Sequence, residues 1–204
     1  MDRLTQSVRG ITKHAPELRT VPKIFICTSP PPPGDVSRYA VEPMPDDLRE
    51  QILDLIAQAE TAIPDELLPN LPPGRHTSGE PEFHSFENSI WQIGERIRQL
   101  LLKKTSLRND ETLQSLFLRI SVNPNAKRGR QSFIMLLGHK SCRQHASGIA
   151  SQITDKYVSG HVIGTLLKMQ AADFATEVST CLDADKAWIR NKANIYCKRY
   201  GNTA

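Results

Sequence analysis

From about residue 83 onwards, apolar residues recur every three or four positions, the spacing that places them on one face of an α-helix. The longest such stripe runs from Phe86 to Leu101, and a shorter one runs from Leu113 to Ile120. After Pro124 the pattern divides into short segments at about 131–138, 142–153, 157–169, 172–182 and 186–200. Two to four polar residues separate these segments, which favours short antiparallel helices joined by tight turns.

Only one helix is predicted before residue 83, over about 46–60. Its apolar residues share one face, and Asp46 and Asp47 lie at its start, where acidic side chains complement the helix dipole. Thirteen of the 14 prolines lie at or before Pro81, so the rest of this part is predicted to be loop or polyproline II. An apolar run at 22–28 predicts a small β element, either alone or in a hairpin with residues 37–42.

The last segments of the chain repeat one another at an offset of 31 residues. The coinciding pairs are Val158 with Ile189, Val162 with Ala193 and Leu166 with Cys197. A helix pair of about thirty residues that recurs along a chain is typical of an α-solenoid, in which each pair stacks on the next.

These repeats resemble the HEAT-repeat family. Residues 154–158 and 183–190 are similar to its D-x-x-V-R turn, and residues 133–138 and 162–167 are similar to its A-x-x-A-L-G segment. The resemblance covers about residues 109–200 and departs from the family pattern at Ser159 and Val162. It implies an all-α, right-handed stack of helix pairs, and a function that is more often protein binding than catalysis.

Charge divides the chain into the same two parts as proline does. Residues 1–82 hold 8 Lys and Arg against 13 Asp and Glu, a net charge of −5, and residues 83–204 hold 18 against 9, a net charge of +9. We therefore predict an acidic, proline-rich segment over 1–82 that caps one end of a basic helical-repeat domain over 83–204. Such asymmetry indicates that the basic domain meets an acidic partner: a protein, a nucleic acid or the acidic segment itself.

The second helices of a solenoid line one face, so their basic and aromatic residues are candidates for binding. The candidate binding residues are Arg130, Lys168, Trp188, Arg190, Lys192 and Lys198. Trp188 is the candidate aromatic anchor within an acidic-protein-binding or phosphate-binding face. The alternative interpretation places Trp188, Ile189, Tyr196 and Cys197 in the core and treats the basic residues as a solvated surface.

Candidate chemistry is sparse. His139, Cys142 and His145 occur at three-residue steps, and His161 or Cys197 would have to complete a zinc site with them from another repeat. Glu82, His84 and Glu87 lie close enough in sequence for acid–base chemistry, but they also fit the start of a helix. The motifs of nucleotide-binding proteins and common hydrolases are missing. We therefore predict no catalytic residue, no metal and no cofactor.

Composition places the chain among globular proteins, with 39% hydrophobic and 24% charged residues. The first nine residues lack the apolar run of a secretion signal, and the four cysteines show no CxxC spacing, which favours the cytoplasm. The sequence therefore predicts a non-enzymatic, cytoplasmic protein-binding module, for example a neutralising partner of immunity type. The alternative is a DNA-binding or DNA-repair protein of the HEAT-like glycosylase type, which would use its basic face.

Overall fold

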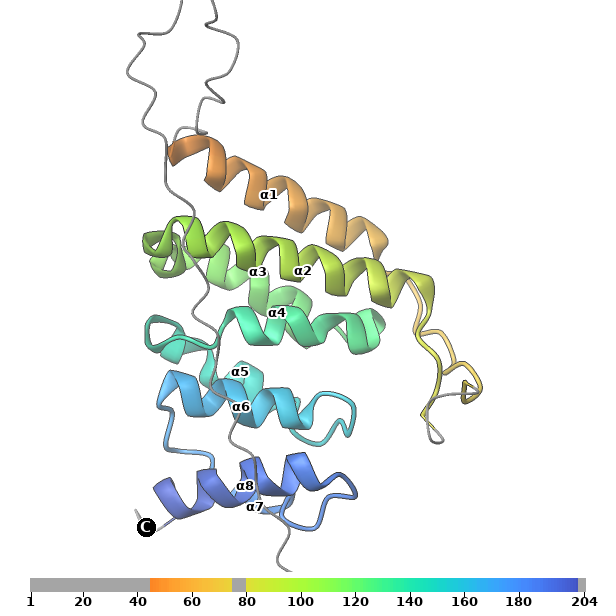
Figure 1. Cartoon of the computed structure of the whole chain (residues 1–204), viewed down its shortest axis with the longest axis vertical. Helices are drawn as coiled ribbons and strands as arrows, with labels where there is room; N and C mark the ends of the chain where they lie inside the picture. The colour runs from red at the N-terminus through yellow and green to blue at the C-terminus, as the bar shows by residue number, and fades with distance from the viewer. Residues whose placement is uncertain (1–44, 75–79, 202–204) are drawn as a thin grey trace, which may run out of the picture. The chain divides into compact units, whose positions relative to one another are not determined.

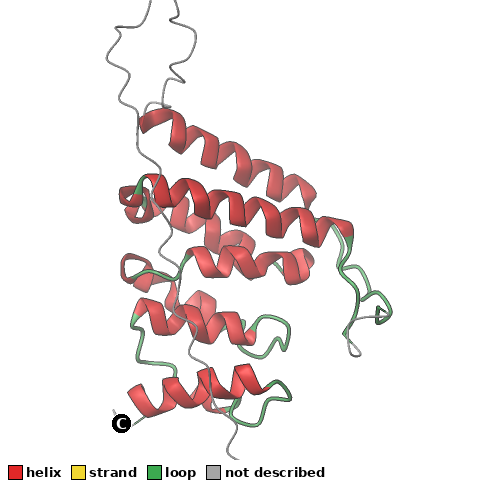
Figure 2. Cartoon of the chain, in the orientation of Figure 1, coloured by secondary structure: helices red, strands yellow, loops and turns green. Residues whose placement is uncertain are grey.

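A computed structural model describes residues 45–74 and 80–201, which belong to one compact unit spanning Glu42–Ala204. The described residues form α-helices and 3₁₀ helices and no sheet, which confirms the all-α prediction (Figure 2). The β element predicted at 22–28 and the proline-rich stretch before residue 45 lie outside the described residues. No helix in the described part of the chain is both long and apolar enough to span a membrane.

The α-helices are arranged in two rows (Figure 1). The longer row stacks five helices one after another: α1 (Pro45–Ala62), α2 (Ser85–Lys103), α4 (Gln131–Leu136), α6 (Ser159–Met169) and α8 (Ala187–Tyr200). The second row holds α3 (Glu111–Val122), α5 (Ala146–Ala150) and α7 (Ala175–Ser179). Three 3₁₀ helices join them: η2 (Thr105–Asn109), η3 (Pro124–Arg130) and η4 (Lys140–His145).

Helix α1 covers one end of the stack. The helix predicted over 46–60 forms over 45–62, and its apolar face is buried against α2 and α3. The buried side chains of that face are Leu48, Ile52, Leu55, Ile56 and Ala59. Helix α1 packs on α2 and belongs to the same compact unit as the helices that follow it.

Three ion pairs also join the acidic segment to the basic domain. In one of them Arg49 Nε lies 2.9 Å from Asp110 Oδ2, and in the other two a carboxylate of the acidic segment meets a cation of the basic domain. The Glu60 carboxylate accepts a hydrogen bond from Arg119 Nε at 2.7 Å, and Glu80 Oε1 lies 3.0 Å from Lys186 Nζ at the start of α8. Part of the opposite charge of the two segments is therefore neutralised within the chain.

Helices α2 and α4 approach each other closely because α2 has a glycine at their contact. A Cβ atom on Gly94 would lie 2.1 Å from Ser132 Oγ of α4. The apolar stripe predicted for this helix forms its buried face, with Ile90, Ile97 and Leu101 in the core.

The repeated positions of the last units occupy similar places in the core. Val158 and Ile189 are both buried, and so are Val162 and Ala193, while Leu166 is buried and Cys197 is half-buried. One continuous apolar core links the rows, as expected when each helix pair stacks on the next. This arrangement is compatible with a helical repeat.

Candidate binding surface

Three of the six predicted binding residues gather where α6 meets α8. Trp188 and Lys192 lie one turn apart on α8, and Lys192 Nζ lies 4.9 Å from the Trp188 ring centroid. Lys168, on the last turn of α6, is close enough to Lys192 for their positive charges to repel. With His161 of α6, these residues form what we call the α6–α8 face (His161, Lys168, Trp188 and Lys192).

Trp188 is exposed on one side and packed against its neighbours on the other. Its side chain is 41% exposed, so the prediction that it belongs to the core is wrong, whereas Ile189 and Tyr196 are core residues as that interpretation held. The indole lies directly on the backbone of Gly160, where a Cβ atom would come within 2.1 Å of the ring. The His161 ring meets it edge-on at 5.5 Å. A large aromatic side chain is thus held in one orientation at the surface.

The lysines of this face have no acidic partner. Within residues 45–74 and 80–201, neither Lys168 nor Lys192 forms an ion pair. Lys192 Nζ instead donates a hydrogen bond to the Gly160 carbonyl at 2.9 Å. Partial burial lowers the pKa of Lys192, and the neighbouring Lys168 lowers it further. An acidic group placed here would favour the charged form of Lys192 and so oppose both effects.

His161 is neutral at pH 7. Burial lowers its pKa to about 4, and the positive charges of Lys192 and Lys186 act in the same direction. The positive charge of the α6–α8 face therefore comes from its lysines.

The other three predicted residues lie elsewhere. Arg130 is 3% exposed, and its guanidinium pairs with Asp155 and donates to Gln152 Oε1. Arg190 donates to the carbonyls of Ala184 and Asp185, which closes the turn before α8. Lys198 is exposed on α8. Arg130 and Arg190 thus both make hydrogen bonds within the chain, although Arg130 Nε is buried and has no partner among the described residues.

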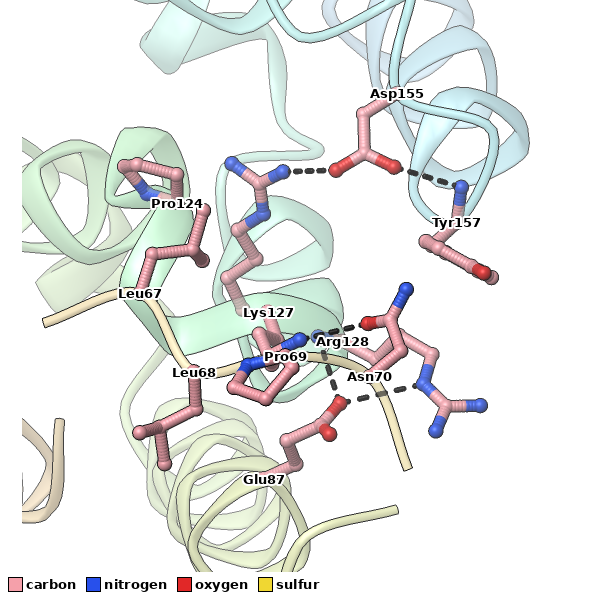
Figure 3. Close-up of a pocket in the computed structure, with 11 residues that line it drawn as sticks. Leu67, Leu68, Pro69, Asn70, Glu87, Pro124, Lys127, Arg128, Asp155 and Tyr157 are labelled. Atoms are coloured by element: carbon pink, nitrogen blue, oxygen red, sulfur yellow. Dashed lines mark hydrogen bonds and ion pairs between the residues drawn. The ribbon is translucent and has the colours of Figure 1, made fainter. Parts of the chain in front are cut away.

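A cavity of about 530 Å³ lies along the side of the stack where helices α2, α4 and α6 begin, which we call the amino-terminal edge (Figure 3). On its wall, the buried Glu87 carboxylate accepts hydrogen bonds from Arg128, through the backbone N–H at 3.0 Å and Nε at 3.2 Å. Its other oxygen accepts the His84 N–H, so Glu87 joins the start of α2 to η3. Asp155 accepts a hydrogen bond from a terminal guanidinium nitrogen of Arg130 and also accepts the Tyr157 N–H at 2.8 Å.

This edge contains the residues considered for acid–base chemistry. The Glu87 carboxylate is hydrogen-bonded to Arg128, and His84 Nε2 lies 2.9 Å from the Pro69 carbonyl oxygen. The Glu82 carbonyl accepts a hydrogen bond from Arg128, whose guanidinium also stacks 3.6 Å from the Phe83 ring centroid. These contacts join α2, η3 and the loop before α2, and no sequence signal pointed to Arg128 as their centre.

The residues considered for zinc are not brought together. No group of three or more His, Cys, Asp or Glu side chains suited to a metal ion occurs in the described part of the chain. His139 Nδ1 bonds to Ser141 Oγ, Cys142 is a buried free thiol, and His161 packs on Trp188. His145 Nε2 is buried and has no hydrogen-bond partner among the described residues.

No protein-family model, no curated protein and no solved structure matches this chain.

Proposed function

We propose that this chain is a non-enzymatic, HEAT-like helical-repeat module of the cytoplasm that binds another protein through its α6–α8 face. The observation that carries the proposal is Trp188, a large aromatic residue that stays exposed although it is firmly packed on Gly160. Tryptophan is enriched among the residues that dominate protein interfaces, and a side chain ordered before binding loses little entropy on association.

The charge of the face indicates the chemistry of the partner. Neither Lys168 nor Lys192 forms an ion pair within the described residues, and the charge of Lys168 contributes to lowering the pKa of Lys192. A partner that presents Asp or Glu beside an apolar group would pair with both lysines and cover the indole. A neutralising partner of immunity type, which masks an acidic surface of another protein, is one form that such a module takes.

The test compares affinity capture by the wild-type protein and by face variants. Lys168→Glu with Lys192→Glu is expected to weaken the captured protein's binding at least tenfold, about 1.4 kcal/mol. Lys103→Glu with Lys140→Glu changes the net charge equally at exposed lysines outside the face and is expected to leave binding unchanged. Equal losses in both double variants would contradict a specific face.

Trp188→Ala separates binding from folding. Because the indole is 41% exposed, its loss should leave the helical content intact while abolishing capture. Capture that persists with Trp188→Ala would remove the tryptophan from the proposed interface.

The second candidate partner is DNA, since an aromatic ring beside two lysines also suits base stacking and phosphate binding. Fluorescence anisotropy with a duplex and a single-stranded oligonucleotide tests it. Binding dominated by phosphate contacts should weaken linearly in a plot of log affinity against log salt. A protein interface with an aromatic centre should respond far less to salt.

A further inference from the structure

The loop that follows α1 presents acidic and apolar side chains next to each other. In this stretch, which we call the leucine loop (residues 64–70), Asp65, Glu66, Leu67 and Leu68 are consecutive and all exposed. At 62% exposure, Leu67 is the most exposed of the large apolar side chains in the described part of the chain. Figure 3 shows both leucines on the segment that borders the cavity. Neighbouring apolar side chains left in water are typical of a surface that another molecule covers.

Both ends of the leucine loop are held by hydrogen bonds. At one end, Asn125 Nδ2 donates to the Pro64 carbonyl at 3.0 Å and to the Asp65 carbonyl at 2.9 Å. At the other end, Lys127 Nζ donates to Asn70 Oδ1 at 2.6 Å (Figure 3). The exposed side chains are therefore presented by an anchored backbone, which reduces the conformational entropy lost on binding.

The carboxylates of the leucine loop take part in no ion pair. Neither Asp65 nor Glu66 is paired with a cation within residues 45–74 and 80–201. Glu60, near the end of α1, is by contrast paired with Arg119. The loop thus combines two unpaired negative charges with two exposed leucines.

The α6–α8 face has the complementary chemistry. Lys168 and Lys192 form no ion pair within the described residues, and Lys192 Nζ lies 4.9 Å from the centroid of the 41%-exposed Trp188 ring. A cation beside an exposed aromatic ring on one surface matches a carboxylate beside an exposed leucine on the other. The chain therefore carries both halves of one contact.

Within one copy, the two halves are used separately. The hydrogen bonds of the leucine loop go to η3 and to His84 at the start of α2, and in the described part of the chain none goes to α6 or α8. The match is thus open to a second copy. Because each copy carries one loop and one face, a two-fold axis would form the contact twice in one dimer.

We propose that the leucine loop of one copy of this chain binds the α6–α8 face of a second copy, in a dimer in which the two copies exchange this contact. Leu67 covers the Trp188 ring. The Asp65 and Glu66 carboxylates pair with the two lysines of the face. This inference rests on the proposed function, because it names the partner of the same face.

Sedimentation velocity of the full-length chain over a range of concentrations tests the dimer. The wild type is expected to dimerise. The loop variant Glu66→Lys with Leu67→Ser and the face variant Lys168→Glu with Lys192→Glu should each raise the dissociation constant of the dimer by about tenfold or more. Each of these variants alone is therefore expected to be a monomer at concentrations where the wild type is a dimer.

Mixing the two variants separates this contact from other modes of dimerisation. The loop of the face variant and the face of the loop variant are both native, so an equimolar mixture should form a heterodimer. A contact between identical patches, such as face on face, would not be restored by mixing. Asp54→Lys with Leu102→Ser makes matched changes at exposed residues outside the loop and should leave the dissociation constant unchanged.

Three results would overturn the proposal: a wild type that stays monomeric at every concentration, a loop variant that dimerises like the wild type, or a mixture without heterodimer. Should the face variant lose its helical circular dichroism signal, Trp188→Ala replaces it in the mixture. A monomeric chain that still captures another protein through Trp188 would overturn this proposal and leave the proposed function standing. If Trp188→Ala and the face variant change neither dimerisation nor capture, both fail.

Discussion

The amino-terminal edge of the stack and the α6–α8 face are both rich in positive charge, yet they use it in opposite ways. At the edge, Arg128 and Arg130 are buried and each pairs with a carboxylate from a neighbouring layer, Glu87 or Asp155. On the face, the charge of Lys168 acts on Lys192, and neither lysine forms an ion pair within the described residues. Arginine donors thus hold the layers together, while the lysines are available for a partner.

The difference follows from the chemistry of the two side chains. The planar guanidinium of arginine satisfies several acceptors at once and tolerates burial, whereas the lysine ammonium is strongly hydrated and favours the surface. Net charge counts both equally, so the +9 of residues 83–204 overstates the charge that is free to attract a partner.

The largest expected effect comes from breaking the buried pair at the edge. Arg128→Met leaves the Glu87 carboxylate, which is 2% exposed, without its charged partner. Loss of one member of a buried ion pair costs about 3–5 kcal/mol. Urea unfolding followed by circular dichroism should show this loss in the free energy of unfolding.

An exposed ion pair provides the control for this experiment. Arg98 pairs with Glu95 on α2, but the Arg98 side chain is 43% exposed. Arg98→Met should therefore cost less than about 1 kcal/mol. Equal losses from Arg98→Met and Arg128→Met would show that burial does not distinguish the two regions.

The second prediction concerns the pH dependence of stability on the face. His161 has a pKa lowered to about 4, against an ordinary value of 6.5. Between these values the unfolded chain binds the proton and the folded chain does not, so stability falls as pH drops from 6.5 towards 4. This difference corresponds to up to about 3 kcal/mol.

His161→Gln isolates this contribution from those of the other histidines. The variant should lose part of the decrease in unfolding free energy between pH 6.5 and 4 that the wild type shows. Unfolding curves at several pH values measure it, and identical pH profiles for the two proteins would contradict the neutral, buried state of His161.

Helix positions were predictable from sequence because apolar spacing reports directly on the face that each helix buries. The stripe from Phe86 to Leu101 and the helix around 46–60 both form nearly as predicted. Their burial depends on local periodicity, which a single sequence contains.

The candidate site was only partly predictable, because its properties depend on distant neighbours. Glu87 and Arg128 are 41 residues apart, and no periodic pattern links them. Trp188 is 41% exposed and rests on the backbone of Gly160, a contact between two helices that composition does not reveal. Arg130 and Lys168 carry the same charge, and the sequence does not show that Asp155, 25 residues away, lies beside Arg130.

A smaller effect is expected where Trp188 rests on Gly160. Gly160→Ala introduces a methyl group into space that the indole ring occupies, and such overpacking costs about 1–3 kcal/mol. The indole should move into solvent, which shifts its fluorescence to longer wavelength in a Trp91→Phe background. The shift would show that the glycine determines the position of the indole.

Gly148→Ala serves as the matched control, since its new Cβ would meet only the flexible side chain of Leu118, at 3.1 Å. It should leave the fluorescence of Trp188 unchanged and the stability equal or slightly higher, because alanine favours helix more than glycine does. A fluorescence shift of equal size in both variants would contradict the conclusion that the contact with Gly160 fixes the position of the indole.

The smallest expected effect is a slight gain in stability, whereas the substitutions at the edge destabilise the fold. Lys168→Met removes a positive charge that acts on Lys192, so the pKa of Lys192 should rise, and stability should change by about 0.5 kcal/mol or less, in the favourable direction. Removing Arg130, by contrast, should destabilise the fold because Asp155 and Gln152 lose their donor. NMR titration of the Lys192 side chain measures the pKa, and urea unfolding measures the stabilities of Lys168→Met and Arg130→Met. A clear loss of stability in Lys168→Met would mean that this lysine, like Arg130, holds the fold together, and the contrast between edge and face would fail.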